Sequence, residues 1–365
     1  MKVLCVIDSL GSGGAQRQLV NLAIGFKEKG HEVSFLVYHN INFFQGQLDE
    51  AQIQIHYVIE ANYLKRLLKI RKFLRDGNQD AVLSFLEASN FMCEIASLPY
   101  RKWKLIVGER NSNPNILKSF KLRAYRWFHL FTDYIVANSQ ENINIVSKIN
   151  PILSKKKLRV IYNKVDVNLF SPVLNFKNEN KLLNVIVLAG YRKQKNIEGL
   201  INGVNHLNDY YKNQLKIHWY GSAKNEYPEG ETLKNAQNML KMYNLEEIIF
   251  LHEEVKNIAE KIKQYDVVGL FSFYEGFPNT ICEGMASGKP IIASAVSDVP
   301  VFIEEDINGF LCDPNDTQSI ANALIRAIET PKEQLYEMGL RNRAKAEIMF
   351  SVEKTVDMYL EIFND

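Results

Sequence analysis

The sequence predicts two α/β domains, each built on a doubly wound parallel sheet. Its 365 residues suffice for two domains with separate cores. The chain is predicted to begin with an apolar strand at Val3–Ile7, followed by a glycine-rich loop at Gly11–Gly14, an amphipathic helix at Gln18–Lys29 and a second strand at Val33–Tyr38. Strand, helix and strand of these lengths form a parallel βαβ unit. The alternation begins again at Leu183–Leu188, so we expect a second domain there.

The composition excludes several classes of protein. With 46% hydrophobic and 24% charged residues the chain is typical of globular proteins, and no apolar run approaches the ~20 residues of a membrane-spanning helix. The four cysteines are widely spaced and form no C-x-x-C pair, which favours reduced thiols over disulfides or a structural metal site. The short apolar start before Asp8 reads as a buried strand and not as a signal peptide. We therefore expect a cytoplasmic protein.

The net charge of +2 hides an asymmetry between the two halves. Residues 1–175 carry 24 Lys and Arg against 14 Asp and Glu, whereas the remainder carries 20 against 28. The cations alternate with aromatic and aliphatic residues over 63–75, 101–104 and 118–131. Two interpretations stay open: solvated helices whose apolar faces pack on the sheet, or a peripheral patch for anionic lipid at the inner face of the plasma membrane, with Trp127 and Phe128 at the headgroups. No nucleic-acid-binding pattern accompanies these cations, so no nucleic acid partner is expected.

The stretch from Val267 to Pro290 has the strongest chemical pattern. An apolar strand is interrupted at Glu275–Asn279, and a helical pattern begins at Thr280. Amide groups at a helix N-terminus bind anions and oxygen-rich ligands. Glu275 and Glu283 are either solvated surface acids or contacts to two parts of one ligand, and the compact Gly-Phe-Pro-Asn between them favours the ligand.

Residues 273–292, FYEGFPNTICEGMASGKPII, resemble the signature of retaining glycosyltransferases of family 4. The resemblance spans nearly the whole chain and is densest over 183–315. It implies the GT-B fold, in which two Rossmann-like domains face each other across a cleft. The implied organisation is an acceptor-binding domain at 1–172, a nucleotide-sugar-binding domain at 182–345 and a C-terminal helix at 346–365 that crosses back to the first domain. The polar run 175–181 then reads as the linker.

The same resemblance implies roles for individual residues. Glu275 orients the donor sugar, and Glu283 faces the nucleotide ribose. The loop 190–196 resembles the family's R-x-R-x-x-K-N phosphate loop, but Gly190 stands where an arginine is common, so Arg192 and Lys195 must carry the positive charge. We therefore expect Glu275, Lys195 and Arg192 to form the catalytic set. The remaining expected donor contacts are Gly276, Phe277, Pro278, Asn279 and Thr280, together with Gly13 and Gly14.

Gly13 and Gly14 belong to a loop that resembles the family's GGAER loop beside the donor phosphates, with Gln16 where glutamate is frequent. The alternative for this loop is a tight turn that needs positive φ. Arg110 and Asn111 follow a predicted strand in a loop that resembles the family's GERN loop. They are expected acceptor or donor contacts, with a capped turn as the alternative.

The expected reaction moves a sugar from a nucleotide diphosphate donor, expected to be UDP-hexose or UDP-N-acetylhexosamine, to a hydroxyl of a lipid-linked or cell-envelope saccharide. Cations and loop amides can stabilise the leaving diphosphate electrostatically, and no Asp-x-Asp metal motif is present, so neither metal nor cofactor is expected. A non-catalytic nucleotide-sugar-binding GT-B protein is the alternative. A Rossmann oxidoreductase would need a GxGxxG turn with an acid about twenty residues later, which neither half contains.

Overall fold

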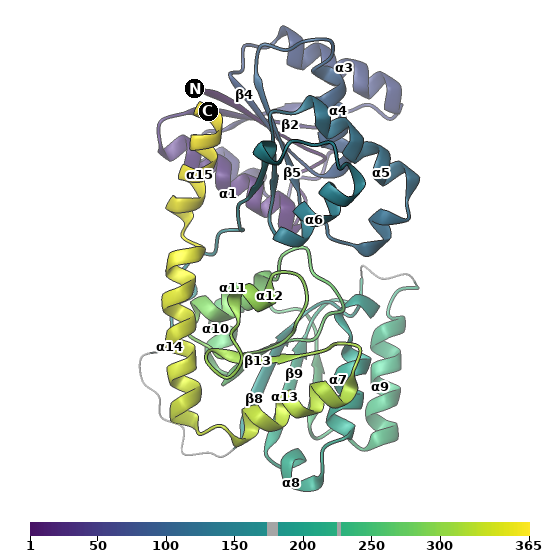
Figure 1. Cartoon of the computed structure of the whole chain (residues 1–365), viewed down its shortest axis with the longest axis vertical. Coiled ribbons are helices and arrows are strands. Elements are labelled where there is room, and N and C mark those ends of the chain that lie inside the picture. The colour runs from purple at the N-terminus through teal and green to yellow at the C-terminus, as the bar shows by residue number, and fades with distance from the viewer. Residues whose placement is uncertain (174–181, 225–227) are drawn as a thin grey trace. The chain divides into compact units, whose positions relative to one another are not determined.

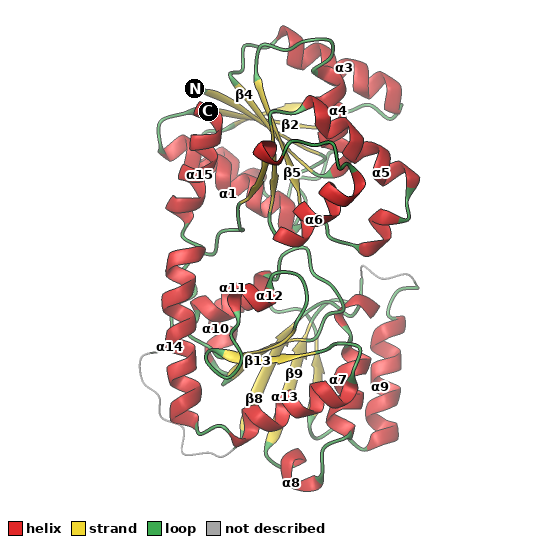
Figure 2. Ribbon diagram, in the orientation of Figure 1, coloured by secondary structure: helices red, strands yellow, loops and turns green. Residues whose placement is uncertain are grey.

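The computed structural model describes residues 1–173, 182–224 and 228–365. The chain divides into two compact units, each of which is described by itself. Unit 1 comprises Met1–Lys164 and Val352–Asp365, and unit 2 comprises Val165–Ser351. In both units, helices cover the faces of a β-sheet (Figures 1 and 2). The expected linker at 175–181 lies outside the described residues.

Unit 1 is organised around a parallel sheet, seven-stranded in the described chain, whose strand order is β3-β2-β1-β4-β5-β6-β7. The strands are β1 (Lys2–Ile7), β2 (Glu32–Val37), β3 (Gln54–Tyr57), β4 (Ala81–Phe85), β5 (Lys104–Glu109), β6 (Tyr134–Ala137) and β7 (Leu158–Val160). The chain proceeds in one direction from β1 to β3 and in the other from β4 to β7. This reversal beside β1 defines the doubly wound topology.

The helices of unit 1 bury both faces of its sheet. The longer ones are α1 (Gly14–Glu28), α3 (Tyr63–Asp76), α4 (Glu87–Ala96), α5 (Phe120–Trp127), α6 (Gln140–Ile149) and α15 (Val352–Asn364), with shorter turns at α2 (Gln45–Glu50), η1 (Pro114–Leu117), η2 (Phe128–Phe131) and η3 (Lys155–Lys157). One hydrophobic cluster joins the sheet to α1 and α15, and another joins it to α3, α4 and α6. The last helix of the chain, α15, therefore packs beside the first, α1 (Figure 1).

Unit 2 repeats the architecture with a sheet that has six strands in the described residues, in the order β10-β9-β8-β11-β12-β13. All of these pairings are parallel. The strands are β8 (Leu183–Leu188), β9 (Leu215–Tyr220), β10 (Ile249–His252), β11 (Val267–Leu270), β12 (Ile291–Ser294) and β13 (Gly309–Cys312). The reversal here falls between β8 and β11, the two central strands.

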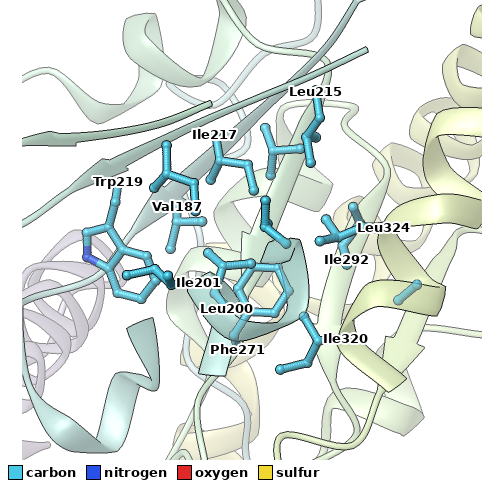
Figure 3. Packing of buried hydrophobic residues seen from close by; sticks show 14 of the residues in the cluster. Val187, Leu200, Ile201, Leu215, Ile217, Trp219, Phe271, Ile292, Ile320 and Leu324 are labelled. Atoms are coloured by element: carbon cyan, nitrogen blue, oxygen red, sulfur yellow. The ribbon is translucent and has the colours of Figure 1, made fainter. Parts of the chain in front are cut away.

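The main core of unit 2 lies between this sheet and the helices α7 (Ile197–Asn205), α9 (Glu231–Tyr243) and α13 (Thr317–Glu329). Trp219 is its largest fully buried side chain, and it lies in one cluster with Val187 and Ile201 (Figure 3). The remaining helical elements are α8 (Asp209–Lys212), α10 (Ile258–Lys263), α11 (Asn279–Ala286), α12 (Val299–Phe302), α14 (Lys332–Met349) and the 3-10 turn η4 (Lys193–Lys195).

The sequence predicted most elements to within a few residues. The first helix begins at Gly14 and not at Gln18, because the Arg17 amide already donates to the Gly13 carbonyl and closes a helical turn. Ser139 caps α6, since its Oγ accepts a hydrogen bond from the Asn142 amide. No helix in the described parts of the chain has the length and apolar character to span a membrane.

Candidate functional site

The reversal point of the unit 2 sheet brings together the two loops in which the catalytic residues were predicted. The strands β8 and β11 are parallel neighbours, and the loops 189–196 and 271–278 follow them at the same edge of the sheet. In doubly wound sheets, ligands bind in the crevice outside the carboxyl ends of the strands at such a reversal. The topology therefore marks this edge as the candidate donor site.

Lys195 and Glu275, predicted from separate motifs, meet at this edge. The Lys195 ammonium donates to Glu275 Oε1 at 2.7 Å. The Glu275 residue is only 6% exposed, whereas a fifth of the Lys195 side chain remains accessible. A charge pair that is partly withdrawn from water interacts more strongly than a surface pair. The site thus holds a positive and a negative group in contact, suited to a ligand that carries both anionic oxygens and hydroxyl groups.

Gln194 joins the two loops and was not predicted as a site residue. Its side-chain amide donates to the Tyr274 carbonyl at 2.7 Å, and its own carbonyl accepts from the Phe273 amide at 2.9 Å. These two hydrogen bonds join the backbone just before Lys195 to the backbone just before Glu275. No sequence signal distinguished Gln194, because its role depends on a loop 80 residues away. Arg192 occupies the N-cap position of η4, without a capping side-chain hydrogen bond, and is exposed at the same loop.

The loop after β8 is supported by side chains from the neighbouring strands. The Tyr191 hydroxyl donates to the carbonyls of Trp219 and His252, and Trp219 Nε1 donates to the Ala189 carbonyl at 2.7 Å. Gly221 lies so close that a Cβ there would overlap the Ala189 carbonyl oxygen. A glycine is therefore required at 221 by close backbone approach, not by positive φ.

The signature loop places its predicted donor residues in different environments. Thr280 Oγ donates to the Leu188 carbonyl at 3.1 Å, so α11 is tied to the end of β8. The Phe277 ring is buried edge-to-face against Phe302 and Phe350. Its side chain stabilises the loop from within, which leaves only its backbone to contact a donor. The other expected donor residues are partly exposed at Gly276, Asn279 and Glu283 and buried at Pro278.

The neighbouring strands β9 and β10 carry a stacked histidine pair. His218 Nδ1 and His252 Nε2 lie 3.0 Å apart, with nearly parallel rings. Burial lowers the pKa of His218 to about 4, with His252 adding to the effect. Burial also lowers the pKa of His252. Both rings are therefore neutral near pH 7 and can share a hydrogen bond.

Gly13 and Gly14 lie at the N-terminus of α1, where the chain leaves the carboxyl end of β1. Gly13 has φ of −70°, so the alternative of a turn that requires positive φ is wrong here. The Gln16 side chain folds back over Gly13, where a Cβ would overlap it, and its amide donates to Asp8 Oδ1 at 3.0 Å. Because this neighbour is the end of a flexible side chain, the contact alone does not require glycine at 13.

Arg110 and Asn111, the expected acceptor residues, follow β5 in unit 1. The Asn111 side chain is exposed and donates to Glu87 Oε1 at 3.1 Å. The Arg110 guanidinium donates to Asn163 Oδ1 at 3.1 Å and to the Tyr359 hydroxyl at 2.5 Å. The structure therefore gives Arg110 internal partners, whereas Asn111 presents its side chain to solvent.

Family models divide the chain in the same way as its two sheets. Residues 12–169 match the model described as Glycosyltransferase Family 4, and residues 171–345 match Glycosyl transferases group 1. The two matches are consecutive and together cover most of the sequence. The chain is a family-4 glycosyltransferase of the GT-B fold.

Known relatives resemble this glycosyltransferase over most of its length. It is 25% identical to the GalNAc-alpha-(1->4)-GalNAc-alpha-(1->3)-diNAcBac-PP-undecaprenol alpha-1,4-N-acetyl-D-galactosaminyltransferase of Campylobacter jejuni, over 89% of this chain and 88% of that protein. It is 26% identical to the UDP-Gal:alpha-D-GlcNAc-diphosphoundecaprenol alpha-1,3-galactosyltransferase of Escherichia coli, over 67% of this chain and 65% of that one. Anabaena HepE, solved in complex with UDP and glucose, has the same fold, with a TM-score of 0.84, 19% identity and coverage of 100% and 99% of the two chains.

A buried ionic cluster supports the loop that follows β5. His129 contacts Glu94 Oε1 at 2.5 Å and Glu109 Oε1 at 3.0 Å, and Arg126 donates to Glu109 Oε2 at 2.6 Å. Burial disfavours the charged imidazole, but the carboxylates of Glu94 and Glu109 outweigh it and raise the pKa of His129 to about 9. Because Glu109 directly precedes Arg110, this neutralised cluster fixes the start of the loop.

Proposed function

We propose that this glycosyltransferase moves a hexosyl or N-acetylhexosaminyl group from a UDP-sugar to a hydroxyl of a lipid-linked or cell-envelope saccharide, with retention of configuration and without a metal. The Lys195–Glu275 contact of 2.7 Å at the β8–β11 reversal carries this proposal. A nucleotide sugar presents an anionic diphosphate directly beside sugar hydroxyls, and the paired ammonium and carboxylate match these two parts.

The proposed mechanism divides the donor between the groups of this edge. Lys195 and Arg192 stabilise the charge that develops on the diphosphate as the bond from the anomeric carbon to the phosphate oxygen breaks. Glu275 accepts hydrogen bonds from sugar hydroxyls and orients an oxocarbenium-like transition state. The acceptor oxygen forms the new bond on the same face, and its proton passes to the departing phosphate oxygen. Glu283, about one turn after the start of α11 at Asn279, is assigned to the ribose hydroxyls.

The substrate class is supported by the relatives. The Campylobacter and Escherichia coli enzymes act on undecaprenol diphosphate-linked saccharides, and the latter is named for a UDP-galactose donor. HepE was solved with UDP and glucose. The proposal extends these chemistries to this chain. In unit 1 it assigns the backbone of Gly13 and Gly14 to the donor phosphates and Asn111 to the acceptor, with Arg110 in the same loop.

The proposal includes contact of unit 1 with an anionic membrane. Leu64 and Leu68 on the basic helix α3 are 67% and 64% exposed, and Phe120 at the start of α5 is 86% exposed. Exposed apolar side chains among cations suit a surface of anionic headgroups. Phe128, predicted at the headgroups, instead packs on Phe91 of α4 with ring centroids 4.8 Å apart.

Two assays test the proposed function. A thermal-shift panel of UDP-, GDP- and ADP-sugars identifies the donor, because a ligand that binds only the folded state raises the melting temperature. Transfer from the radiolabelled donor to an undecaprenol diphosphate-linked saccharide, with and without EDTA, then measures turnover. Donor binding without transfer or hydrolysis would favour the alternative of a non-catalytic binding protein, and loss of activity with EDTA would refute metal independence.

Sedimentation with liposomes tests the membrane contact separately. We expect binding to vesicles that contain phosphatidylglycerol, weakened by salt and by Leu68→Ser on the exposed face of α3. Leu340→Ser, at an exposed leucine of α14 in unit 2, is the matched control. Equal sedimentation with neutral and anionic vesicles would contradict the proposal.

A further inference from the structure

The chain passes between its two units twice, and one side chain contacts the unit 1 end of both passages. The first passage follows Lys164, and the second precedes Val352. Arg110 donates from Nη1 to the side chain of Asn163, the neighbour of Lys164, at 3.1 Å. It donates from Nη2 to the hydroxyl of Tyr359, in the helix that begins at the second passage, at 2.5 Å.

The surroundings of the Arg110 guanidinium offer it few other hydrogen-bond partners. Its central carbon lies 3.9 Å from the centroid of the Phe85 ring at the end of β4. Its Nε is buried and has no hydrogen-bond partner among the described residues. Tyr359 and Asn163 are 1% and 6% exposed. Water only partly replaces a partner that this half-buried guanidinium loses, so removal of either bond should perturb the other.

The segments at the unit 1 ends of both passages also contact α1. The Lys164 ammonium donates to the Asn21 carbonyl, and Gln18 donates to the Lys164 carbonyl. On the other side, Lys29 contacts Asp357 at 2.5 Å, and Val356 fills the space above Gly25. Arg110 adds what α1 lacks: a connection from both segments to the loop after β5.

We propose that Arg110 is a positioning residue for transfer, which holds both interunit passages in register with the loop that carries Asn111. This inference rests on the proposed function, in which unit 2 binds the donor and Asn111 contacts the acceptor. The passages are the only covalent connections of unit 2 to the acceptor-side loop. A single guanidinium bonded to segments next to both of them fixes the unit 1 ends of the passages against this loop. Arg110 therefore acts through Asn163 and Tyr359, not by direct contact with the acceptor.

The test compares Arg110→Gln, Tyr359→Phe and the double variant with the wild type. Tyr359→Phe keeps the buried ring and the arginine but removes the shared hydroxyl. We expect each single variant to lower kcat for transfer about tenfold with unchanged binding of UDP, and the double variant to be no worse than Arg110→Gln. Tyr134→Phe is the matched control, because its hydroxyl also bonds the C-terminal segment, at Asp365, but does not contact Arg110.

Hydrogen–deuterium exchange decides the inference independently of activity. If Arg110 couples the passages, Tyr359→Phe should speed exchange in the peptide 158–166, which Tyr359 reaches through Arg110. Unchanged exchange there, together with a higher acceptor KM for Arg110→Gln alone, would overturn the proposal in favour of direct acceptor contact. A wild-type protein without transferase activity would refute the proposed function and leave this exchange result valid. Unchanged melting temperatures and circular dichroism in Tyr359→Phe establish that the variant folds.

Discussion

Replacement of Lys195 by methionine tests the candidate donor site most directly. The change keeps most of the length of the side chain but leaves the carboxylate of Glu275, which is 6% exposed, without its 2.7 Å partner. Removal of one member of a buried pair costs about 3–5 kcal/mol. Because a fifth of the Lys195 side chain reaches water, we expect a cost somewhat below this range, about 2–3 kcal/mol. In a unit of this size that corresponds to a melting temperature lower by about 5–10 °C.

The same substitution should affect catalysis by a separate route. If Lys195 stabilises the leaving diphosphate, its loss should lower kcat by about 10²–10³-fold, the range seen when one preorganised electrostatic contact is removed. Differential scanning calorimetry measures stability, and transfer of a radiolabelled sugar measures turnover. The double variant Lys195→Met with Glu275→Gln should recover most of the stability, because no buried charge remains unpaired, but it should not recover activity.

Lys193 provides the matched control on the same loop. It pairs with Glu231 at 3.2 Å, but its side chain is 69% exposed, and such surface pairs contribute about 0–1 kcal/mol. Lys193→Met should therefore change neither the melting temperature nor kcat appreciably. Equal effects of Lys193→Met and Lys195→Met would refute the reasoning, because they would show that burial and contact with Glu275 do not matter.

Three further predictions concern residues that stabilise the candidate donor site in unit 2 and the loop after β5 in unit 1. Phe277→Leu should destabilise unit 2 by about 2 kcal/mol, because the variant loses two edge-to-face ring contacts in the core, and calorimetry measures the change. Gly221→Ala should cost about 2–3 kcal/mol and weaken donor binding in the thermal-shift assay, because the new methyl displaces the Ala189 carbonyl. The raised pKa of His129, about 9 against 6.5, should stabilise unit 1 by on the order of 3 kcal/mol below pH 6.5. Since the folded value is the higher one, this stabilisation is lost as the pH rises from 6.5 through 9, as urea unfolding across that range would measure.

Matched substitutions define what would contradict these predictions. Phe273→Leu changes an exposed ring on the signature loop, so it should leave stability almost unaltered, and a loss equal to that of Phe277→Leu would argue against the core role. Gly46→Ala has open space around it and should be neutral or stabilising. His129→Gln should lose the pH-dependent term, whereas His206→Gln, at an exposed histidine, should keep it. A stability that does not depend on pH between 6.5 and 9 in the wild type would count against a charged His129.

Much of the architecture was accessible from the sequence because the relevant signals are local. The periodicity of apolar residues predicted β8 over Leu183–Leu188, as the structure has it, whereas the C-terminal helix expected at 346–365 is divided, with α14 ending at Met349 and α15 beginning at Val352. A resemblance carried by contiguous residues marked Glu275 and Lys195, and the structure brings the two into contact. The pairing of β8 with β11 cannot be deduced from either segment alone. The 2.7 Å contact between Lys195 Nζ and Glu275 Oε1, which depends on that pairing, is therefore a result of the tertiary structure.

The sequence by itself determined which chemical groups this glycosyltransferase has and the order in which strands, loops and helices present them, since backbone propensity and hydrophobic periodicity act over a few residues. The tertiary structure alone decided which of those groups are free to act. Packing turned the Phe277 ring toward a core, and two partners separated from Arg110 by 53 and 249 residues bind its guanidinium. The direction of a side chain depends on contacts between segments that are distant in the sequence. A local sequence pattern does not specify those contacts.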